Sequence, residues 1–323
     1  MILSILIAAY NVEQFIEKCV LSCYNEKLSS LYEIIVVNDG STDNTETIVE
    51  TLKQKVPNLK LVSQRNSGLG AARNTGLDHA EGKYVWMIDG DDFLTENAVE
   101  TVLSELSSGL DVYAYNFNIT DENGVVLSQK YNAGFPEEVM TGSEYYAQNF
   151  DSSYTAQFIF RRELFTVNNI RFIDRINMQD SEILPRLLYY TKKMKYNDSP
   201  VYNYVQHAGS FTNTTDSSKR LRYFESIITV DHSLQQFAES IGSDDQLLCD
   251  TIALKRASLH QIVFNHLVFF SYSPPIFHQV IKLLQENGFY PLKAKQSGKF
   301  ALVRTCLNML PYSTKKLIEL VRQ

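Results

Sequence analysis

Residues 84–92 of the chain read Y-V-W-M-I-D-G-D-D. The first five residues are large and apolar, which predicts a buried β-strand. Three carboxylates follow, at Asp89, Asp91 and Asp92. They therefore lie where a strand ends, which is the edge at which open α/β sheets bind ligands. Clustered carboxylates suit a hard cation such as Mg²⁺ or Mn²⁺, or else a solvated acidic turn that caps a helix beginning near Thr95.

Similar apolar runs occur earlier, and segments of helical character separate them. Asn11 suits the cap of the first helix, which would run to about residue 24, and Asp43 or Asn44 suits the cap of the second. A further helix should end near His79. This strand–helix alternation predicts a parallel, doubly wound sheet. The expected strands span residues 2–7, 33–37, 59–63 and 83–88.

Polar and small residues gather where these strands should end. Because the carboxyl ends of parallel strands meet at one edge, we expect them to line one crevice, although each alone also suits an ordinary cap or turn. Asp39 could accept a hydrogen bond from a base or a ribose hydroxyl, and Arg65 and Arg73 could meet phosphate charge. The other members of this set are Ala9, Asn11, Asp43, Asn66, Gly68, Gly70 and Asp91.

Two common phosphate-binding motifs do not fit this chain. Residues 67–72, S-G-L-G-A-A, lack the third glycine of the dinucleotide fingerprint and follow the third expected strand rather than the first. The sequence also contains no P-loop.

Length and composition indicate about two globular domains. The chain has 323 residues, of which 44% are hydrophobic and 21% charged, so it can bury a substantial core. The net charge of -7 argues against general nucleic-acid binding. Residues 291–323 differ from the rest, because seven basic residues and one acid give them +6 and leave -13 for residues 1–290.

The cysteines and the start of the chain favour a cytoplasmic protein. The cysteines show no zinc-binding spacing and suit buried free thiols in a reducing compartment. The N-terminal segment lacks a basic region before its apolar run, and no run of 18 apolar residues predicts a membrane span. The four cysteines are Cys19, Cys23, Cys249 and Cys306.

Taken in order and spacing, several strings resemble the family 2 glycosyltransferases of the GT-A fold. The resemblance covers roughly residues 1–212 and implies a Rossmann-like mixed sheet flanked by helices, with a nucleotide-sugar half at about 1–110 and an acceptor half at about 111–212. It also implies an inverting hexosyltransferase that uses a nucleotide sugar, most simply a UDP-linked hexose or N-acetylhexosamine. Its setting would be bacterial polysaccharide biosynthesis or protein glycosylation. The strings are I-L-I-A-A-Y-N (5–11), V-V-N-D-G-S-T-D-N-T (36–45), N-S-G-L-G-A-A-R-N-T-G (66–76), residues 81–92, R-E-L-F (162–165) and N-M-Q-D-S-E (177–182).

By this resemblance, the donor-binding residues come from the strand ends. Asp39 would contact uracil, and Asp89 would contact the ribose or the sugar. Asp91 would hold a divalent metal, Mn²⁺ or Mg²⁺, on the diphosphate, with Asp92 a weaker candidate beside it. Arg73 would lie near the base or the phosphates. The remaining donor-binding positions implied are Ala9, Tyr10, Asn11, Asn66 and Gly70.

The family usually supplies a general base from a Glu-Asp pair that often follows a histidine. Here the matching residues are Met178, Gln179 and Asp180, so Asp180 takes the position of the base while its two neighbours depart from the pattern. An inverting displacement needs such a carboxylate to take the proton of the acceptor hydroxyl. Asp180 also suits a first-turn acid of a helix over residues 181–190, and Glu182 is an alternative base.

His207 precedes Gly209-Ser210 in a segment that resembles one with a basic residue at that position. It could bind the metal or the diphosphate, and it equally suits an ordinary strand-end histidine. The other histidines show no paired metal-binding spacing.

The second half of the chain is less informative. Residues 111–212 are rich in aromatics, most of which suit a core, with Tyr154 and Gln157 as weak acceptor-site candidates. From residue 217 to 323 the pattern becomes helical, with a break at 273–275. This helical domain could pack on the catalytic domain or form a homodimer. Its basic end could contact the inner membrane face through anionic lipid, or be the basic face of a packed domain.

Two other functions fit parts of the sequence. A nucleotidyltransferase would share the fold type and the metal, but it would need a basic, glycine-rich loop where residues 8–11 read A-A-Y-N. A non-catalytic nucleotide- or glycan-binding protein is favoured only by Gln179, while the retained Asp91 and Asp180 argue for an enzyme.

Overall fold

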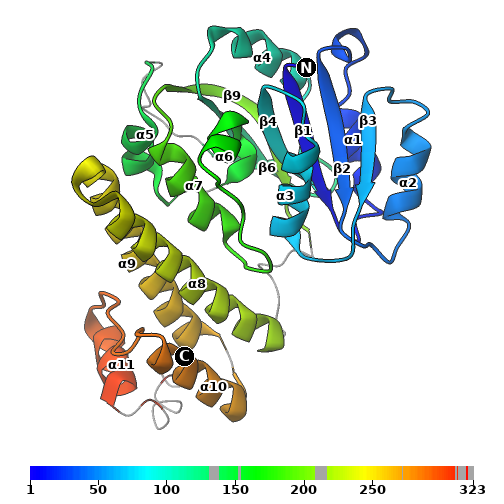
Figure 1. The fold of residues 1–323 in the computed structure, drawn as a ribbon. Coiled ribbons are helices and arrows are strands. Elements are labelled where there is room, and N and C mark those ends of the chain that lie inside the picture. The colour runs from blue at the N-terminus through cyan, green and yellow to red at the C-terminus, as the bar shows by residue number, and fades with distance from the viewer. Residues whose placement is uncertain are drawn as a thin grey trace. The chain divides into compact units, whose positions relative to one another are not determined.

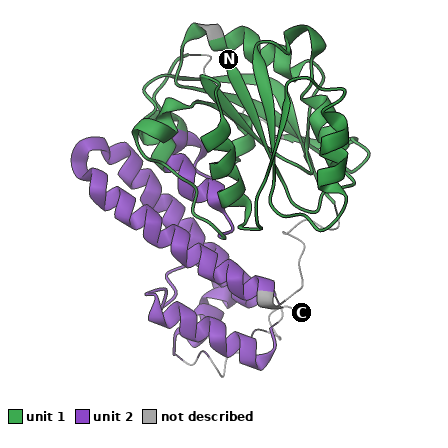
Figure 2. Cartoon of the chain, turned by 45° about the vertical axis from the view of Figure 1, so that its right-hand side comes forward, with its two compact units in different colours: residues 1–145, 152–175, 186–210 green, residues 146–151, 176–185, 211–323 purple. Residues whose placement is uncertain are grey.

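The computed structural model describes residues 1–130, 138–151, 154–207, 217–270, 272–309, 311 and 318. The chain divides into two compact units, which are coloured separately in Figure 2. Unit 1 comprises residues 1–145, 152–175 and 186–210, and unit 2 comprises residues 146–151, 176–185 and 211–323.

The strands all belong to unit 1. The described residues form one sheet of nine strands in the order β3-β2-β1-β4-β8-β6-β9-β5, with β7 paired to β6. The strands are β1 (Leu3–Ala9), β2 (Tyr32–Asn38), β3 (Leu59–Ser63), β4 (Tyr84–Asp89), β5 (Phe93–Leu94), β6 (Val112–Thr120), β7 (Val126–Lys130), β8 (Phe158–Arg161) and β9 (Met194–Val205).

Helices follow or separate these strands (Figure 1). Short 3₁₀ turns occur at Glu26–Leu28, Leu106–Ser108, Thr155–Gln157 and Gly242–Asp245. The α-helices are α1 (Ile16–Ser22), α2 (Thr45–Leu52), α3 (Leu69–His79), α4 (Ala98–Glu105), α5 (Gly142–Asn149), α6 (Glu163–Val167), α7 (Gln179–Tyr189), α8 (Ser217–Ile241), α9 (Gln246–Phe269), α10 (Pro274–Glu286) and α11 (Gly298–Met309).

The sheet is mixed. Strands β1 to β4 are parallel to one another, as the alternating pattern predicts. Beyond β4 the direction changes, because β8 pairs antiparallel with both β4 and β6. Strand β9 then runs parallel to β6. The expected fold class, a Rossmann-like mixed sheet flanked by helices with a helical C-terminal region, is confirmed.

Apolar side chains cover the parallel strands on both faces. On one face, Ile5, Ile34 and Trp86 belong to a single buried cluster with residues of α1, α2 and α4. On the other face, α3 packs on the sheet, where Gly76 faces the side chains of Leu6 and Val37. Burial on both faces explains why the central strands β1, β2 and β4 are largely apolar, whereas the edge strand β3 is partly exposed.

The helix caps differ in part from those that the sequence predicts. Asn11 does not cap a helix, because α1 begins only at Ile16 and Asn11 has a left-handed backbone with φ 53°. Asp43 is the acid that caps α2, since its Oδ1 accepts from the Thr45 amide at 3.0 Å, whereas Asn44 makes no side-chain cap. The helix expected near Thr95 begins at Ala98.

Unit 2 is predominantly helical, as the pattern after residue 217 predicts. Helices α8 and α9 pack together, and the Arg256 guanidinium donates to both Asp231 carboxylate oxygens at 2.9 Å. Helix α10 begins at Pro274, where the sequence predicts a break. Among the described residues, no helix combines the length and apolarity that crossing a membrane would require.

A buried carboxylate joins three strands at the amino edge of the sheet. Glu33 on β2 is 1% exposed and accepts from the Ser4 hydroxyl at 2.6 Å and from the Glu81 amide at 2.8 Å. Lys60 on β3 places its Nζ 2.7 Å from the Glu33 Oε2. Burial alone would raise the pKa of Glu33, but the Lys60 ammonium and the Ser4 and Glu81 donors together hold that pKa below its ordinary value.

We expect Glu33→Gln to lower the free energy of unfolding by about 1–3 kcal/mol at pH 7, because charge-assisted bonds are lost in a buried site. The folded-state pKa of Glu33 is depressed, so the stabilisation is complete above the ordinary glutamate pKa of about 4.3. It disappears as the pH falls through the lower folded-state pKa. Urea unfolding of the parent and of Glu33→Gln, repeated at pH values on both sides of these pKa values, measures the difference in the free energy of unfolding.

Glu81→Gln is the matched control, because Glu81 contacts the same lysine but its side chain is 67% exposed. Its effect should stay within about 0.5 kcal/mol. Equal losses in the two variants, or a Glu33→Gln loss that does not change with pH, would contradict this account.

Candidate functional site

The acidic turn after β4 packs directly on the end of β1. The two strands run side by side in register, with Ala8 opposite Asp89. The Gly90 amide then donates to the Ala8 carbonyl at 3.0 Å. A Cβ at Gly90 would lie only 2.9 Å from that carbonyl oxygen, so this close approach requires glycine.

Asp89 is paired with an arginine from α3. The Arg73 Nη2 lies 2.9 Å from the Asp89 Oδ1, and the Arg73 side chain is 4% exposed whereas that of Asp89 is 32% exposed. The guanidinium also lies 5.3 Å from the centre of the Phe172 ring. The pair therefore presents a carboxylate at the surface that a buried cation neutralises.

Asp91 lies beside His207. The His207 Nε2 is 3.0 Å from the Asp91 Oδ2, although the two residues are 116 positions apart. The imidazole also packs on the Phe15 ring, with the ring centres 4.9 Å apart. The tertiary fold thus joins two of the residues that the sequence singles out as metal ligands.

Asp92 is buried and binds residues of β9. It is 2% exposed and accepts from the Val205 amide at 2.7 Å and from the Tyr202 hydroxyl. Burial, with the neighbouring charges of Asp91 and Asp89, raises the pKa of Asp92 well above its ordinary value. These bonds fix the end of β9, which places His207 two residues further on.

Asp39, at the end of β2, holds the loop between β3 and α3. Its Oδ1 accepts from the Gln64 side chain at 2.7 Å and the Ser67 amide at 2.8 Å, and its Oδ2 accepts from the Gly68 amide at 2.8 Å. A carboxylate has roughly four acceptor sites. Donors from the described residues occupy three of them, and Asp39 is itself 3% exposed.

The loop after β1 is tied to the loop after β2. The Asn11 Oδ1 accepts from the Thr42 amide at 2.8 Å, and the Asn11 amide donates to the Ser41 hydroxyl at 3.0 Å. Asp43 Oδ2 accepts from the Glu13 amide at 3.0 Å. Although burial opposes it, the bonds from Thr45 and from the Glu13 amide lower the pKa of Asp43.

The remaining expected donor-site residues lie on the same loops. Tyr10 is 48% exposed, whereas Ala9 is buried. The Asn66 carbonyl accepts from the Arg175 guanidinium at 2.9 Å, and Gly70 is buried in the first turn of α3. Arg65 is exposed, and Gly68 has φ 93°, which favours glycine.

The donor set at Asp91 and His207 fits a divalent cation. Within the described residues, no group of three or more acidic, histidine or cysteine side chains is arranged to hold a metal alone. Mg²⁺, however, is often bound by one or two protein ligands together with substrate phosphates. The Asp91 Oδ2 and the His207 Nε2, which lie 3.0 Å apart in a hydrogen bond, are an oxygen and a nitrogen donor of the kinds that divalent cations accept.

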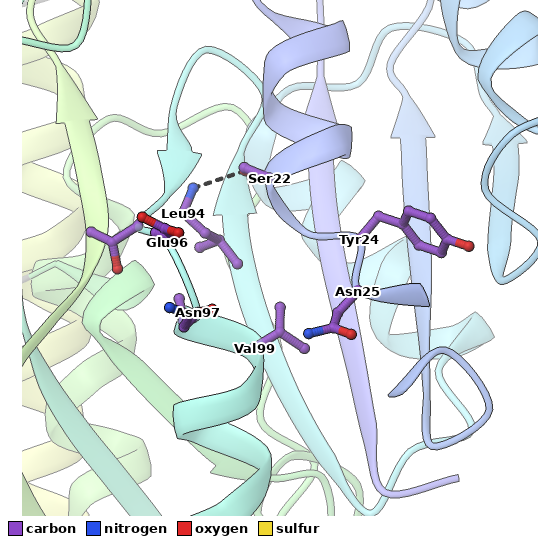
Figure 3. Close-up of a pocket in the computed structure, with 9 residues that line it drawn as sticks. Ser22, Tyr24, Asn25, Leu94, Glu96, Asn97 and Val99 are labelled. Atoms are coloured by element: carbon purple, nitrogen blue, oxygen red, sulfur yellow. Dashed lines mark hydrogen bonds between the residues drawn. The ribbon is translucent and has the colours of Figure 1, made fainter. Parts of the chain in front are cut away.

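Described residues of unit 1 line two pockets of similar volume. One, of about 370 Å³, borders His207, Phe15 and Asn11 and is acidic because Asp43 and two glutamates line it. The other, of about 360 Å³, lies between the end of α1 and the start of α4, where the Leu94 amide donates to the Ser22 hydroxyl at 2.9 Å (Figure 3). None of the expected site residues lines this second pocket.

Asp180 belongs to unit 2, where it is the second residue of α7. It is half-buried, whereas Gln179 before it is 4% exposed. Glu182 is 1% exposed and its Oε1 accepts from the Ser233 hydroxyl at 2.6 Å. Of the two acids considered for the base, Asp180 is therefore the more accessible.

The two acceptor-site candidates both contribute to the packing of unit 1, where Tyr154 is half-buried and Gln157 is buried. Tyr154 lies between the rings of Phe117 and Tyr204, with ring centres 4.9 and 6.1 Å away. Gln157 is 2% exposed and donates to the Tyr145 hydroxyl at 3.1 Å. Gly209 and Ser210, which follow His207 in the sequence pattern, lie outside the described residues.

The sequence did not predict two sets of residues that support the site. Phe15 is an ordinary apolar residue in the sequence, yet its ring supports His207. Tyr202 and Val205 bind Asp92 across 110 or more positions. The alternation of β9 indicates a strand, but no local signal indicates where that strand ends relative to the acidic turn.

With this geometry, the chain matches the model of Glycosyl transferase family 2 over residues 4–168, which is about half its length, and it belongs to that family. It is similar to the uncharacterized glycosyltransferase YibD of Escherichia coli (strain K12), with 28% identity over 72% of this chain and 70% of the relative. It is also similar to a chondroitin synthase of Escherichia coli, with 39% identity over 41% of this chain and only 19% of that protein.

The fold agrees with a solved structure over almost the whole chain. The crystal structure of S. aureus TarS 1-349 in complex with UDP-GlcNAc superposes with a TM-score of 0.67 over 99% of this chain and 90% of that one, at 18% identity. The family therefore makes this protein a glycosyltransferase, and the structural likeness supports the fold.

We expect Asp92→Ala to lower the free energy of unfolding by about 1–3 kcal/mol, because the Val205 amide and the Tyr202 hydroxyl lose a buried acceptor. Urea unfolding measures this change. The matched control is Asp91→Ala at the adjacent, 35% exposed position, for which we expect a change within about 0.5 kcal/mol. An Asp92→Ala variant as stable as the parent would contradict the anchoring role.

Proposed function

We propose that this protein transfers a sugar from a UDP-linked donor, with inversion, to a hydroxyl of a saccharide, lipid-linked or glycoprotein glycan acceptor. The observation that carries the proposal is the Asp91–His207 pair, 3.0 Å apart at the carboxyl end of the parallel strands. Family membership and the UDP-GlcNAc complex of the TarS neighbour support it. Family membership and the TarS likeness also support our proposal that the protein acts in polysaccharide biosynthesis.

The nucleoside would lie over the loops that Asp39 and Asn11 organise. Asp39 would accept from a uracil N–H in addition to the three described donors that it binds. Arg73 and Asp89 form a neutral pair, so Asp89 can accept from ribose or sugar hydroxyls without adding net charge beside the diphosphate. Ala9, Tyr10, Asn66 and Gly70 would complete this surface with backbone and side-chain contacts.

Asp91 and His207 would hold the divalent cation. When bound, such a cation neutralises the negative charge that develops on the departing nucleoside diphosphate. The Phe15 ring and the Asp92 bonds to β9 would keep His207 oriented beside Asp91. Correct orientation of a histidine ligand typically matters for metal affinity by a factor of about 10–100.

Asp180 would act as the general base. In an inverting displacement, the acceptor oxygen forms the new bond to the anomeric carbon as the bond to the diphosphate breaks, and the carboxylate takes the acceptor proton. Glu182 suits this task less, because it is buried and bonded to Ser233.

We expect the parent to release UDP, with water taking the sugar in place of the acceptor, from at least one of UDP-glucose, UDP-galactose, UDP-GlcNAc and UDP-GalNAc in the presence of Mn²⁺. Asp91→Ala should abolish both this release and metal-dependent UDP binding, as should removal of the cation by EDTA. Asp180→Ala should bind UDP with Mn²⁺ normally but lose roughly 10²–10⁴-fold in turnover, the usual contribution of a general base. Calorimetry measures UDP binding, and a coupled assay measures UDP release.

The exposed Asp174 gives a matched control, since Asp174→Ala should leave both quantities unchanged. If the parent binds UDP with Mn²⁺ but turns over no donor, a non-catalytic nucleotide-binding protein gains support. Release of pyrophosphate from a nucleoside triphosphate and a sugar phosphate would instead indicate a nucleotidyltransferase.

We also propose peripheral contact with an anionic membrane through the segment 293–309. Lys293, Lys295 and Lys299 are exposed there, and α11 exposes Leu302 (58%) and Met309 (75%). Basic residues with nearby apolar side chains bind anionic bilayers, at roughly 1 kcal/mol per residue near the surface.

Changing all three lysines to glutamate should weaken cosedimentation with phosphatidylglycerol vesicles by about 100-fold or more. The control changes three exposed lysines of unit 1 to glutamate, namely Lys27, Lys53 and Lys55. This control variant should lose far less of its cosedimentation with the vesicles. An equal loss in the two variants, or a parent that does not bind the vesicles, would overturn this contact.

A further inference from the structure

The segment of residues 171–175 is fastened to helix α3. The Asn74 side chain donates to the Phe172 carbonyl at 2.9 Å, and the Phe172 amide donates to the Asn74 Oδ1 at 3.0 Å, although 98 positions separate the two residues. Phe172 is itself buried. Because a side-chain amide carries both a donor and an acceptor, the two bonds fix the register of the segment on α3.

This segment ends at an arginine with an unusual backbone. Arg175 has φ 57°, a left-handed conformation that is uncommon for a residue with a long side chain. Such a conformation persists where surrounding contacts determine it, and it is often found at functional sites. Glycine would adopt this conformation more easily, so arginine at this position favours a role for its side chain.

Arg175 contacts the loop between β3 and α3 through its side chain and its backbone. Its Nη2 donates to the Asn66 carbonyl at 2.9 Å. A Cβ added to Gly68 would lie 3.4 Å from the Arg175 Cα, so the Arg175 backbone lies beside Gly68. Asp39 binds the same loop, because it accepts from the Ser67 and Gly68 amides at 2.8 Å. Arg175 and Asp39 therefore hold one short stretch of chain.

The strand order places this loop at the nucleoside end of the proposed site. Asp39 follows β2, and a Cβ on Gly40 would lie 2.8 Å from the Asn66 amide nitrogen, so the loop lies against the end of β2. Strand β1 separates β2 from β4, which Asp91 follows. Neighbouring strands lie about 4.8 Å apart, so the ends of β2 and β4 are roughly 10 Å apart. Arg175 is therefore on the uracil side of the proposed donor, away from the proposed metal ligands.

The Arg175 guanidinium can bind a further acceptor. Arginine has five N–H donors, and among the described residues the Arg175 side chain donates only to Asn66. The side chain is exposed, whereas Arg73 on α3 is buried and paired with Asp89. A pyrimidine base such as uracil presents carbonyl oxygens at its edge, which are suitable acceptors for these donors.

We infer that Arg175 is a further donor-binding residue, whose guanidinium donates to a carbonyl oxygen of the uracil ring. The inference rests on the proposed function, in which a UDP-linked sugar is the donor. The bond to Asn66 holds the guanidinium in place before the nucleotide arrives. Less side-chain freedom is then lost on binding, which favours affinity.

The test measures the Kd of UDP with Mn²⁺ for the parent and for Arg175→Ala by calorimetry. The measurement is repeated with 2-thio-UDP and 4-thio-UDP, in each of which sulfur, a weak acceptor, replaces one carbonyl oxygen of the base. We expect Arg175→Ala to weaken UDP binding roughly tenfold, as the loss of one hydrogen bond from a charged donor should. One thio analogue should lose less than about threefold, because its complex already lacks that bond, and the other should behave as UDP does.

Controls separate this contact from a general effect on folding. Arg171→Ala is the matched variant, because Arg171 is an exposed arginine of the same segment that pairs with Asp78 instead of the loop. Its Kd for all three ligands should stay within about twofold of the parent. Circular dichroism and gel filtration establish that each variant is folded. Arg175→Gly suits the left-handed backbone, so it should lose UDP affinity as Arg175→Ala does and replaces that variant if it does not fold.

The outcomes distinguish the inference from the proposed function. A parent that does not bind UDP with Mn²⁺ overturns both. Parent-like UDP binding by folded Arg175→Ala, or by Arg175→Gly in its place, overturns the inference alone. An equal loss for UDP and both thio analogues also overturns it, because Arg175 would then act on the loop, the ribose or the phosphates and not on a uracil oxygen.

Discussion

Three carboxylates within four residues can share one turn only because each has a different partner. Asp89 meets a buried guanidinium, Asp91 meets an imidazole, and Asp92 accepts bonds from β9. The partners come from α3 and from the end of β9, so both elements must end at the correct place for the turn to be stable. Like charges this close repel strongly in a partly buried site, and the fold around the turn is the arrangement that compensates for this repulsion.

The same principle organises the neighbouring loops. Asp39, Asp43 and Asn11 each use side-chain oxygens to accept backbone amides from another loop. Loops rarely have regular partners for their amides, and an unpaired buried amide is costly. Acidic and amide side chains therefore provide order here without secondary structure. The result is a surface of fixed backbone, on which the proposed nucleotide would bind with little further ordering, which favours affinity.

Unit 2 shows that the helical region is more than an addition to the end of the chain. Residues 146–151 and 176–185 pack with helices from beyond residue 217, and the candidate base belongs to this group. In unit 2, the buried carboxylates of Asp231 and Glu182 are matched with donors on other segments. Buried polar pairs of this kind can specify one arrangement of helices where apolar packing alone would allow several, which is a hypothesis for this protein.

The sequence by itself determined the parallel strands and the helices between them, because apolar periodicity and turn residues act over short distances. It also indicated which polar residues lie at the strand ends, as Asp39 and Asp91 do. The partners of those residues depended on the tertiary structure. Nothing local pairs Asp91 with His207, removes Asp92 from the surface, assigns Asn11 to a loop rather than a helix cap, or brings Arg175 to the Asn66 carbonyl. Each of these depends on where distant chain segments end relative to one another, and only the packed sheet and helices fix that geometry.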